Sequence, residues 1–452
     1  MMLDASRVAA VLEPYCVQLD PTDKSWIASL DATATTAAAA ADSPGTHSRA
    51  VPSSQLSTPA FAVGLSALAH NLGTMQEWID AHDALFAPHG KTTMSPALWA
   101  AQLDAGAWAI TVATEAQLRV ARAAGIRRVV VANQFLSPQG LAWLAAQLAD
   151  DHSFEVICWV DSLAAVEQMT RHLRTAGIGR RVGVCVEVGA AGGRTGARDR
   201  ATALAVAEAV LGSPALALVG VSGYEGIVPA TAGLGRDDAV RAFLDEMAAT
   251  FLAMADLFET AEPLLTAGGS SFFDLVVDAF APVRQSIPRA RIVLRSGSYI
   301  VHDDALYRES TPAATRTGPR FIAAAHVFAR VVSVPEPGLA LLDAGKRDVP
   351  YDAGLPILQC VLREFPDGSQ RWVDAPAATV TGLNDQHAYV SFEDAAVATG
   401  DDAVGPALRV GDIVRLGLSH PCTMFDKWRS FMVLDDRDTS NPIVLGALAT
   451  YF

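Results

Sequence analysis

The sequence predicts a (β/α)8 barrel of the TIM type followed by a β domain. Between residues 58 and 320, short apolar segments alternate with amphipathic segments, which indicates βα units and a parallel sheet. About eight such repeats match the length of a closed barrel, which is roughly 250 residues. After residue 320 the pattern changes to strands and turns without obvious helices. A doubly wound sheet is the alternative, but no GxGxxG motif follows the first expected strand.

The individual elements can be placed in order along the chain. Apolar segments predict barrel strands at 60–63, 85–86, 108–112, 129–132, 155–160, 182–187, 217–221, 264–267 and 291–295. Helical periodicity predicts helices at 65–80, 97–103, 115–124 and 139–149, with more helices between the later strands. We expect strands of the β domain at 325–334, 339–343, 357–363, 388–392 and 413–418.

These elements divide the chain into three parts. Residues 1–57 form an N-terminal segment whose end, 31–57, is rich in Ala, Ser, Thr and Pro and is typical of a flexible linker. Residues 58–320 form the barrel, and residues 321–452 form the β domain.

Composition excludes several classes of function. The net charge of −15 argues against nucleic acid and anionic membranes as partners. No apolar run reaches the length of a membrane span, and the N-terminus lacks the pattern of a secretory signal. The five cysteines are scattered and form no CxxC pair, which fits a reducing cytoplasm.

Lys91 is the first candidate for chemistry. The 34 basic residues Lys and Arg include only four lysines, and Lys91 lies between an expected strand and an expected helix. Pro88 and Gly90 next to it indicate a tight loop. A lysine held at such a junction can form a Schiff base with a carbonyl cofactor or substrate. The alternative is an ordinary lysine in a surface loop.

Two turns rich in glycine and serine follow the last two expected barrel strands. They are Gly268-Gly269-Ser270-Ser271 and Ser296-Gly297-Ser298-Tyr299. Barrels often bind phosphate in these loops, because glycine lets backbone N–H groups approach an anion and serine adds hydroxyl donors. A phosphate site together with a Schiff-base lysine describes pyridoxal 5'-phosphate (PLP). Plain βα turns are the alternative interpretation.

A second cluster lies near the C-terminus, where His420 and Cys422 follow an expected strand two residues apart. Imidazole and thiolate can bind one Zn²⁺ ion, and two protein ligands leave positions open for water or substrate. Another divalent metal is also possible. The alternative is a buried cysteine beside an ordinary histidine.

Taken together, these motifs resemble the D-serine dehydratase and D-threonine aldolase family of fold-type III PLP enzymes, whose barrel is similar to that of alanine racemase. The matching segments are 88–92, 131–134, 187–188, 194–196, 223–226, 268–270, 295–299, 342–345 and 420–422. The chain departs from the family pattern at Asn384-Asp385-Gln386-His387, where an acidic pair is usual before the histidine, and in the longer stretch 189–193 before Arg194.

The resemblance implies roles for individual residues. Lys91 would hold PLP and act as the general base on a D-amino acid. Tyr224 would be a catalytic residue that contacts the cofactor and faces the substrate, and packing at the barrel rim is the alternative. The resemblance also places eight further residues around the cofactor: Gln134, Arg194, Gly268, Gly269, Ser270, Gly297, Ser298 and Tyr299. His420 and Cys422 would hold zinc, which makes hydroxide a better leaving group. His387 and Asp385 are further candidates on the substrate side, and a homodimer is implied.

Three functions are compatible with the sequence. The first is a PLP- and zinc-dependent dehydratase of a D-β-hydroxy amino acid such as D-serine. The second is a metal-dependent D-threonine aldolase, which yields glycine and an aldehyde. The resemblance favours dehydration, because the family's aldolases carry a carboxylate where this chain has Cys422. The third is a non-catalytic PLP-binding protein, although proteins of that kind lack a β domain.

Overall fold

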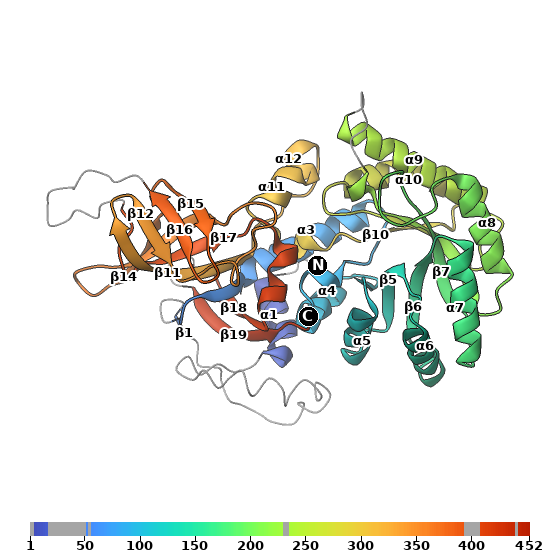
Figure 1. Ribbon diagram of the computed structural model, residues 1–452, viewed down its shortest axis with the longest axis horizontal. Helices are drawn as coiled ribbons and strands as arrows, with labels where there is room; N and C mark the ends of the chain where they lie inside the picture. The colour runs from blue at the N-terminus through green and yellow to red at the C-terminus, as the bar shows by residue number, and fades with distance from the viewer. Residues whose placement is uncertain (1–3, 17–50, 53–55, 229–234, 393–406, 439–441) are drawn as a thin grey trace.

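The computed structural model describes residues 4–16, 51–52, 56–228, 235–392, 407–438 and 442–452. Figure 1 shows a parallel barrel with its helices and, beside it, a large mainly antiparallel sheet. Two short helices, α11 (Leu306–Ser310) and α12 (Pro312–Thr315), lie on the chain between the barrel and that sheet. In the part of the chain so described, no helix is both long and apolar enough to cross a membrane.

Eight parallel strands form the barrel. Their order in the sheet is β3-β10-β9-β8-β7-β6-β5-β4. Their bounds are β3 (Leu85–Phe86), β4 (Ile110–Val112), β5 (Arg128–Gln134), β6 (Glu155–Val160), β7 (Val182–Val188), β8 (Leu216–Gly223), β9 (Leu264–Ala267) and β10 (Arg291–Leu294). The ring closes between β3 and β4, where Trp108 N–H donates to Phe86 O at 2.7 Å and Thr111 N–H donates to Pro88 O at 2.9 Å. The predicted fold class is therefore confirmed.

Eight helices surround the barrel: α3 (Leu65–Ala81), α4 (Pro96–Asp104), α5 (Glu115–Ala123), α6 (Pro138–Asp150), α7 (Leu163–Thr175), α8 (Arg200–Leu211), α9 (Arg236–Ala253) and α10 (Phe273–Ser286). Several begin at a residue whose side chain caps the helix. The side-chain oxygens of Ser137, Ser162 and Asp199 each accept the backbone N–H of the third residue after them. Each such cap stabilises its helix by about 1 kcal/mol.

The barrel strands are buried on both faces, which explains their continuous apolar runs. One face packs against the helices in the main hydrophobic core. The other face forms a separate cluster whose buried members all come from strands or their ends, and this cluster fills the barrel interior. Its members are Ala87, Ala109, Val130, Ile157, Trp159, Cys185, Leu264 and Val293.

The second sheet contains eleven strands. They are β1 (Val51–Pro52), β2 (Ala60–Gly64), β11 (Ala325–Glu336), β12 (Leu339–Leu342), β13 (Ile357–Glu364), β14 (Gln370–Asp374), β15 (Ala378–Leu383), β16 (Ala388–Phe392), β17 (Ile413–Gly417), β18 (Ser430–Asp435) and β19 (Ile443–Ala449).

Strand β2 was predicted to be the first strand of the barrel, but it lies in the second sheet. It pairs with β11 in the antiparallel direction and with β18 in the parallel direction. All five of its residues are buried. A continuous apolar run of this kind is compatible with a strand of either sheet, so the sequence pattern alone could not assign it. The chain thus begins in the second sheet and enters the barrel through α3. The domain boundaries at 57 and 320 stay predictions.

The N-terminal segment contains one described helix, α1 (Ala5–Leu12). Val8 and Leu12 are buried, and Arg7 forms an ion pair with Asp104 of α4 at 2.9 Å. Most of the expected linker at 31–57 lies outside the described residues.

Candidate active site

Lys91 lies on a single 3-10 turn, Gly90–Thr92, that follows β3 at the carboxyl end of the barrel. The indole N–H of Trp99 donates to Gly90 O at 3.2 Å. A Cβ atom at Gly90 would lie 2.5 Å from the Trp99 ring nitrogen, so only glycine fits next to the lysine. The backbone of Lys91 is therefore held firmly, as the tight loop in the sequence predicted.

The surroundings of Lys91 favour the neutral amine. Partial loss of hydration lowers the pKa of Lys91, and the charges of Arg194 and Arg295 lower it further. Cys422 acts in the opposite direction. The residue is still exposed to solvent, so a substrate can reach its amine. A lowered pKa increases the fraction of lysine that can act as a nucleophile or base near neutral pH.

The two glycine- and serine-rich turns lie side by side at the ends of β9 and β10. The Ser298 hydroxyl donates to Ser270 Oγ at 2.6 Å, and both serines are buried. Gly268 has a φ of +98°, a conformation that favours glycine. A Cβ atom at Gly297 would lie 2.4 Å from His89 O, so this turn also packs closely on the lysine loop. The structure brings Lys91 and both predicted turns together.

Glu225 accepts the backbone N–H groups that the Gly268–Ser271 turn, called the glycine turn below, was expected to offer to a phosphate. Its carboxylate accepts Gly268 N–H at 3.0 Å and Gly269 N–H at 2.5 Å, and the side chain is fully buried. The two glycines therefore fix the shape of the turn, and the hydroxyls of Ser270 and Ser298 are the polar groups next to it. Sequence reasoning missed this role, although Glu225 is part of the segment 223–226.

Polar groups also line the end of the barrel interior. Arg295 is buried and donates to Thr266 Oγ1 at 2.5 Å and to Gly223 O at 2.7 Å. Gln134 donates to the Glu187 carboxylate at 2.6 Å, and burial raises the pKa of Glu187. Within the described chain, the Ser222 hydroxyl is buried and has no hydrogen-bond partner. A buried polar atom of this kind indicates a place for a bound polar group.

Tyr224 and Arg194 lie together beside the glycine turn. The Arg194 guanidinium lies 4.8 Å from the centre of the Tyr224 ring. A Cβ atom at Gly269 would lie 2.8 Å from the same ring. Burial raises the pKa of the Tyr224 hydroxyl, and the nearby charge of Glu225 raises it further. The phenol therefore stays protonated and can donate a hydrogen bond.

Tyr299 has a different environment from the other candidates. Its hydroxyl accepts a hydrogen bond from Gln102 at 3.2 Å, and its ring packs against Phe86 with centroids 5.2 Å apart. Burial raises the pKa of this hydroxyl. Because the side chain packs against α4 and β3, Tyr299 can contribute to a phosphate site only through its backbone.

His420 and Cys422 follow β17 and lie against the lysine loop of the same chain. The Cys422 sulfur is 3.4 Å from Thr92 Oγ1, the residue after Lys91. His420 Nδ1 contacts Asp352 Oδ2 at 2.7 Å, and Asp352 also accepts the Thr423 hydroxyl at 2.6 Å. Burial alone would lower the pKa of His420, but Cys422 and Asp352 raise it to about 9. No cluster of three or more His, Cys, Asp or Glu suited to a metal occurs among the described residues.

Tyr307 and Asp352 are residues of this region that sequence reasoning missed. The Tyr307 hydroxyl is 4.0 Å from Cys422 Sγ, and its ring centre is 6.0 Å from that of His420. Tyr307 lies on α11 and Asp352 on the loop before β13, so both approach from segments without a recognisable motif. Only the fold places them next to the His420–Cys422 pair.

His387 and Asp385 lie on the exposed turn between β15 and β16. Asp385 forms an ion pair with Arg347 at 3.5 Å, and the His387 carbonyl accepts Asn384 N–H at 2.8 Å. Among the contacts of the described chain, none joins these two residues to Lys91 or Cys422. Their expected place on the substrate side stays a prediction.

The barrel, the lysine at its first strand and the two phosphate-type turns define a class of alanine racemase-like barrels with an added β domain. Two family models match the chain in this order. The model "Alanine racemase, N-terminal domain" covers residues 63–284, and the model "Putative serine dehydratase domain" covers residues 324–434.

Individual proteins match over most of the chain. D-threonine aldolase from an Arthrobacter species is 27% identical over 85% of this chain and 91% of its own length. D-threo-3-hydroxyaspartate dehydratase from Delftia sp. strain HT23 is 24% identical over 84% of this chain and 94% of its own length. The crystal structure of D-threonine aldolase from Filomicrobium marinum superimposes with a TM-score of 0.71 and 23% identity, covering 90% of this chain and 98% of that one. Over most of its length this chain is therefore similar to these aldolases and dehydratases, and it carries both domain types in the order that the sequence motifs predicted.

Proposed function

We propose that this protein is a PLP- and zinc-dependent dehydratase that converts a D-β-hydroxy amino acid, such as D-serine, to a 2-oxo acid and ammonia. The observation that carries the proposal is the position of the His420–Cys422 pair. Cys422 lies 3.4 Å from Thr92, directly beside the lysine loop. A metal held there would therefore be close to a substrate that is bound at Lys91.

The residues of the site fit PLP. Lys91 has the lowered pKa that covalent attachment of a carbonyl cofactor needs. The paired hydroxyls of Ser270 and Ser298, 2.6 Å apart, suit a phosphate, and the unpartnered hydroxyl of Ser222 suits a polar group in the barrel mouth. When bound, PLP supplies an electron sink for the charge that develops when a bond to the substrate Cα breaks.

The His420–Cys422 pair fits a catalytic zinc ion. Asp352 contacts His420 Nδ1, which leaves Nε2 of the ring for a metal and orients it, the usual arrangement around metal-bound histidines. Two protein ligands leave coordination positions open, and a catalytic zinc ion keeps one position for water or substrate. Zinc at this place would stabilise the departing hydroxide. A solved structure of a cysteine-to-alanine mutant of a D-threo-3-hydroxyaspartate dehydratase is a metal-free form, which supports a metal in that relative.

This chain's own side chains would then share the remaining work. The neutral amine of Lys91 would take the Cα proton, because its pKa is lowered. The protonated phenol of Tyr224, beside the glycine turn, would donate a hydrogen bond toward the substrate. Loss of water from the substrate followed by hydrolysis gives the 2-oxo acid and ammonia.

Aldol cleavage is the second candidate. D-threonine aldolase is among the relatives that cover most of this chain, and both reactions need a lysine and a metal near the β-hydroxyl. Cys422 favours dehydration, because a thiolate prefers zinc over the harder divalent ions.

Product analysis decides between the two. Purified protein loaded with PLP and zinc should form pyruvate from D-serine, and 2-oxobutanoate with ammonia from D-threonine. Glycine and acetaldehyde as the main products would instead make it an aldolase. A preference for L-substrates would contradict both, and binding of PLP without turnover of any D-hydroxy amino acid would favour the non-catalytic alternative.

We also propose a homodimeric, cytoplasmic protein. The five cysteines are all free, which supports a reducing compartment. Light scattering after size exclusion measures the oligomeric state, and a single-chain mass would contradict the dimer. Cell fractionation measures the location of the protein, and recovery outside the cytoplasmic fraction would contradict this part of the proposal.

A further inference from the structure

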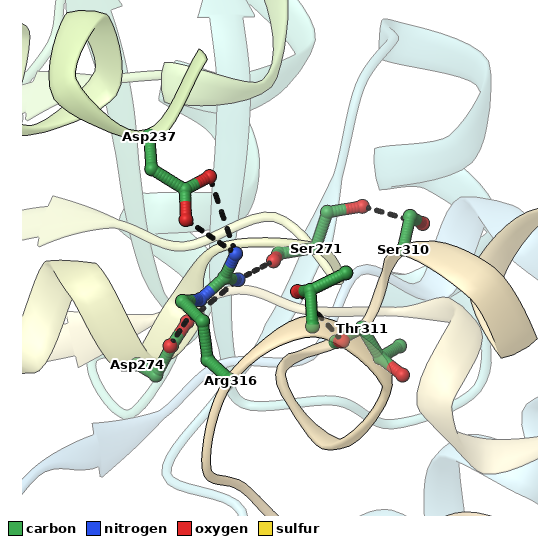
Figure 2. Close-up of polar contacts among 7 residues, drawn as sticks. Asp237, Ser271, Asp274, Ser310, Thr311 and Arg316 are labelled. Carbon is green, nitrogen blue, oxygen red and sulfur yellow. Dashed lines mark hydrogen bonds and ion pairs between the residues drawn. The ribbon is translucent and has the colours of Figure 1, made fainter. Parts of the chain in front are cut away.

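Arg316 is the centre of a polar cluster on the far side of the glycine turn, and no part of the proposed mechanism uses it. It follows α12, and Figure 2 shows its guanidinium between Asp237, Asp274 and Ser271. Its Nε donates to Asp274 Oδ2 at 2.6 Å, while Nη2 donates to Asp274 Oδ1 at 3.1 Å, so this pair is bidentate. Its Nη1 donates to Asp237 at 3.0 Å. All three guanidinium nitrogens are therefore occupied, which fixes the group in place.

One of these bonds reaches the backbone of the turn itself. Nη2 of Arg316 donates to Ser271 O at 2.5 Å, and Ser271 is the last residue of the turn. The Ser271 hydroxyl also contacts the Ser310 hydroxyl at 3.1 Å, so the same segment touches the turn a second time. Arg316 and Asp274 are mostly buried, with side chains 15% and 12% exposed. A charge-assisted bond in such a place is stronger than a surface ion pair.

Glu225 holds the same turn from the barrel interior. Its carboxylate accepts the N–H groups of Gly268 and Gly269 at the start of the turn. The turn is thus held by an anion at its first N–H groups and by a cation at its last carbonyl. Between these two anchors lies Ser270, whose hydroxyl meets Ser298.

This arrangement matters because a glycine-rich turn loses much conformational entropy when it is ordered. A turn that is already held in its binding shape does not incur that cost when the ligand arrives, and affinity rises accordingly. We propose that Arg316, acting against Glu225, is a positioning residue that holds the Gly268–Ser271 turn ready for the phosphate group of PLP. The inference rests on the proposed function, since it assumes that this turn receives the cofactor phosphate.

The test compares two ligands that differ only in the phosphate. Cofactor-free full-length protein is titrated with PLP and, separately, with pyridoxal, and binding is followed by visible absorbance and by tryptophan fluorescence. For Arg316→Gln we expect the dissociation constant for PLP to rise about tenfold or more, as for loss of a hydrogen bond to a charged group. The dissociation constant for pyridoxal should stay within about twofold, because Arg316 acts only on the phosphate turn.

Two further variants control for general damage. Asp237→Asn removes the negative charge of one partner but leaves the bonds to Ser271 and Asp274, so it should change PLP affinity by less than about threefold. Arg200→Gln removes an exposed ion pair with Glu246, 2.8 Å long, and should leave both affinities unchanged. If Arg316→Gln does not fold without cofactor, Arg316→Lys replaces it, since a lysine cannot reach both Ser271 O and the Asp274 carboxylate.

Each outcome has one meaning. Selective loss of PLP affinity supports the positioning role. Equal weakening of PLP and pyridoxal, or no weakening of either, overturns it and leaves Arg316 as a structural ion pair. Failure of the wild-type protein to bind PLP at all contradicts the proposed function instead, so the two failures are distinguishable.

Discussion

At the scale of single residues, the site depends on how Lys91 is surrounded. Loss of hydration and the charges of Arg194 and Arg295 all lower its pKa, while Cys422 opposes them. Of the other two described lysines, Lys346 lies between β12 and β13 and Lys427 lies over the ring of Tyr351 at 5.2 Å, so neither follows a barrel strand. Lys24 lies outside the described residues. This difference makes Lys91 the residue to which a carbonyl cofactor should bind.

The first prediction therefore concerns Lys91. Borohydride treatment of the PLP-loaded protein should fix the chromophore on the peptide that contains Lys91, and peptide mass spectrometry identifies the site. Lys91→Ala should lose this label and nearly all turnover. A label on Lys346 or Lys427 would refute the assignment.

The second prediction concerns Asp352, which contacts His420 Nδ1 at 2.7 Å. Asp352→Asn should weaken zinc binding by about 10- to 100-fold, the usual effect of removing the partner of a metal-bound histidine. Titration with a chromophoric chelator measures this without any activity assay. PLP absorbance should be unchanged. Zinc affinity equal to that of the wild type would show that Asp352 does not orient the histidine.

At the scale of elements, the strands of the second sheet are joined by an ion pair between β13 and the turn before β17. Arg363 and Asp412 are 3% and 4% exposed, with Nη2 and Oδ2 2.6 Å apart. Asp412 also accepts the N–H of Arg409 at 2.9 Å, so it holds the turn as well as the strand. Such a pair is costly to break, because one charge is left buried without its partner.

The third prediction follows from this pair. Asp412→Ala should lower the free energy of unfolding by about 3–5 kcal/mol, measured by urea denaturation. Glu246→Ala breaks the ion pair with Arg200, whose side chains are 43% and 45% exposed, and should cost no more than about 1 kcal/mol. Equal effects of the two substitutions would mean that the buried pair adds nothing beyond a surface one.

At the scale of the whole molecule, the two sheets are joined by the chain's path. β2 lies in the second sheet, between β11 and β18, and yet continues directly into α3 of the barrel. α1 packs on α3 and α4 through Val8 and Leu12. The His420–Cys422 pair, which follows a strand of the second sheet, also contacts the barrel, because Cys422 Sγ lies 3.4 Å from Thr92 Oγ1 in the loop that carries Lys91. The barrel and the second sheet are therefore connected both through β2 and through contacts at the candidate site.

The fourth prediction tests this union. A fragment that ends at residue 320 should not fold cooperatively, because β2 would lose both neighbouring strands and expose a fully buried face. Thermal unfolding followed by circular dichroism measures this. A cooperative transition in the fragment would show that the barrel is stable without the second sheet.

Local signals in the sequence were enough to predict the barrel, and they single out Lys91 as the candidate attachment lysine. Apolar strand segments and the Pro88–Gly90 loop depend on a few neighbouring residues, so they can be recognised without knowing which segments pack against them. The same holds for the two glycine turns and for the His420–Cys422 spacing. In the second sheet, however, β1, β14, β15, β18 and β19 were not predicted. β14 and β15 are mostly exposed or half-buried, so their sequences give weak periodicity.

Tertiary structure alone decided the rest. β2 reads equally well as a barrel strand, because burial on both faces has no periodicity that distinguishes one sheet from another. Glu225 and Arg316 reach the glycine turn from 43 and 45 residues away along the chain, and Asp352 reaches His420 from 68 residues away. A motif can be recognised from residues that are neighbours in the sequence. The residues that hydrogen-bond to it come from distant segments, so only the fold determines which they are.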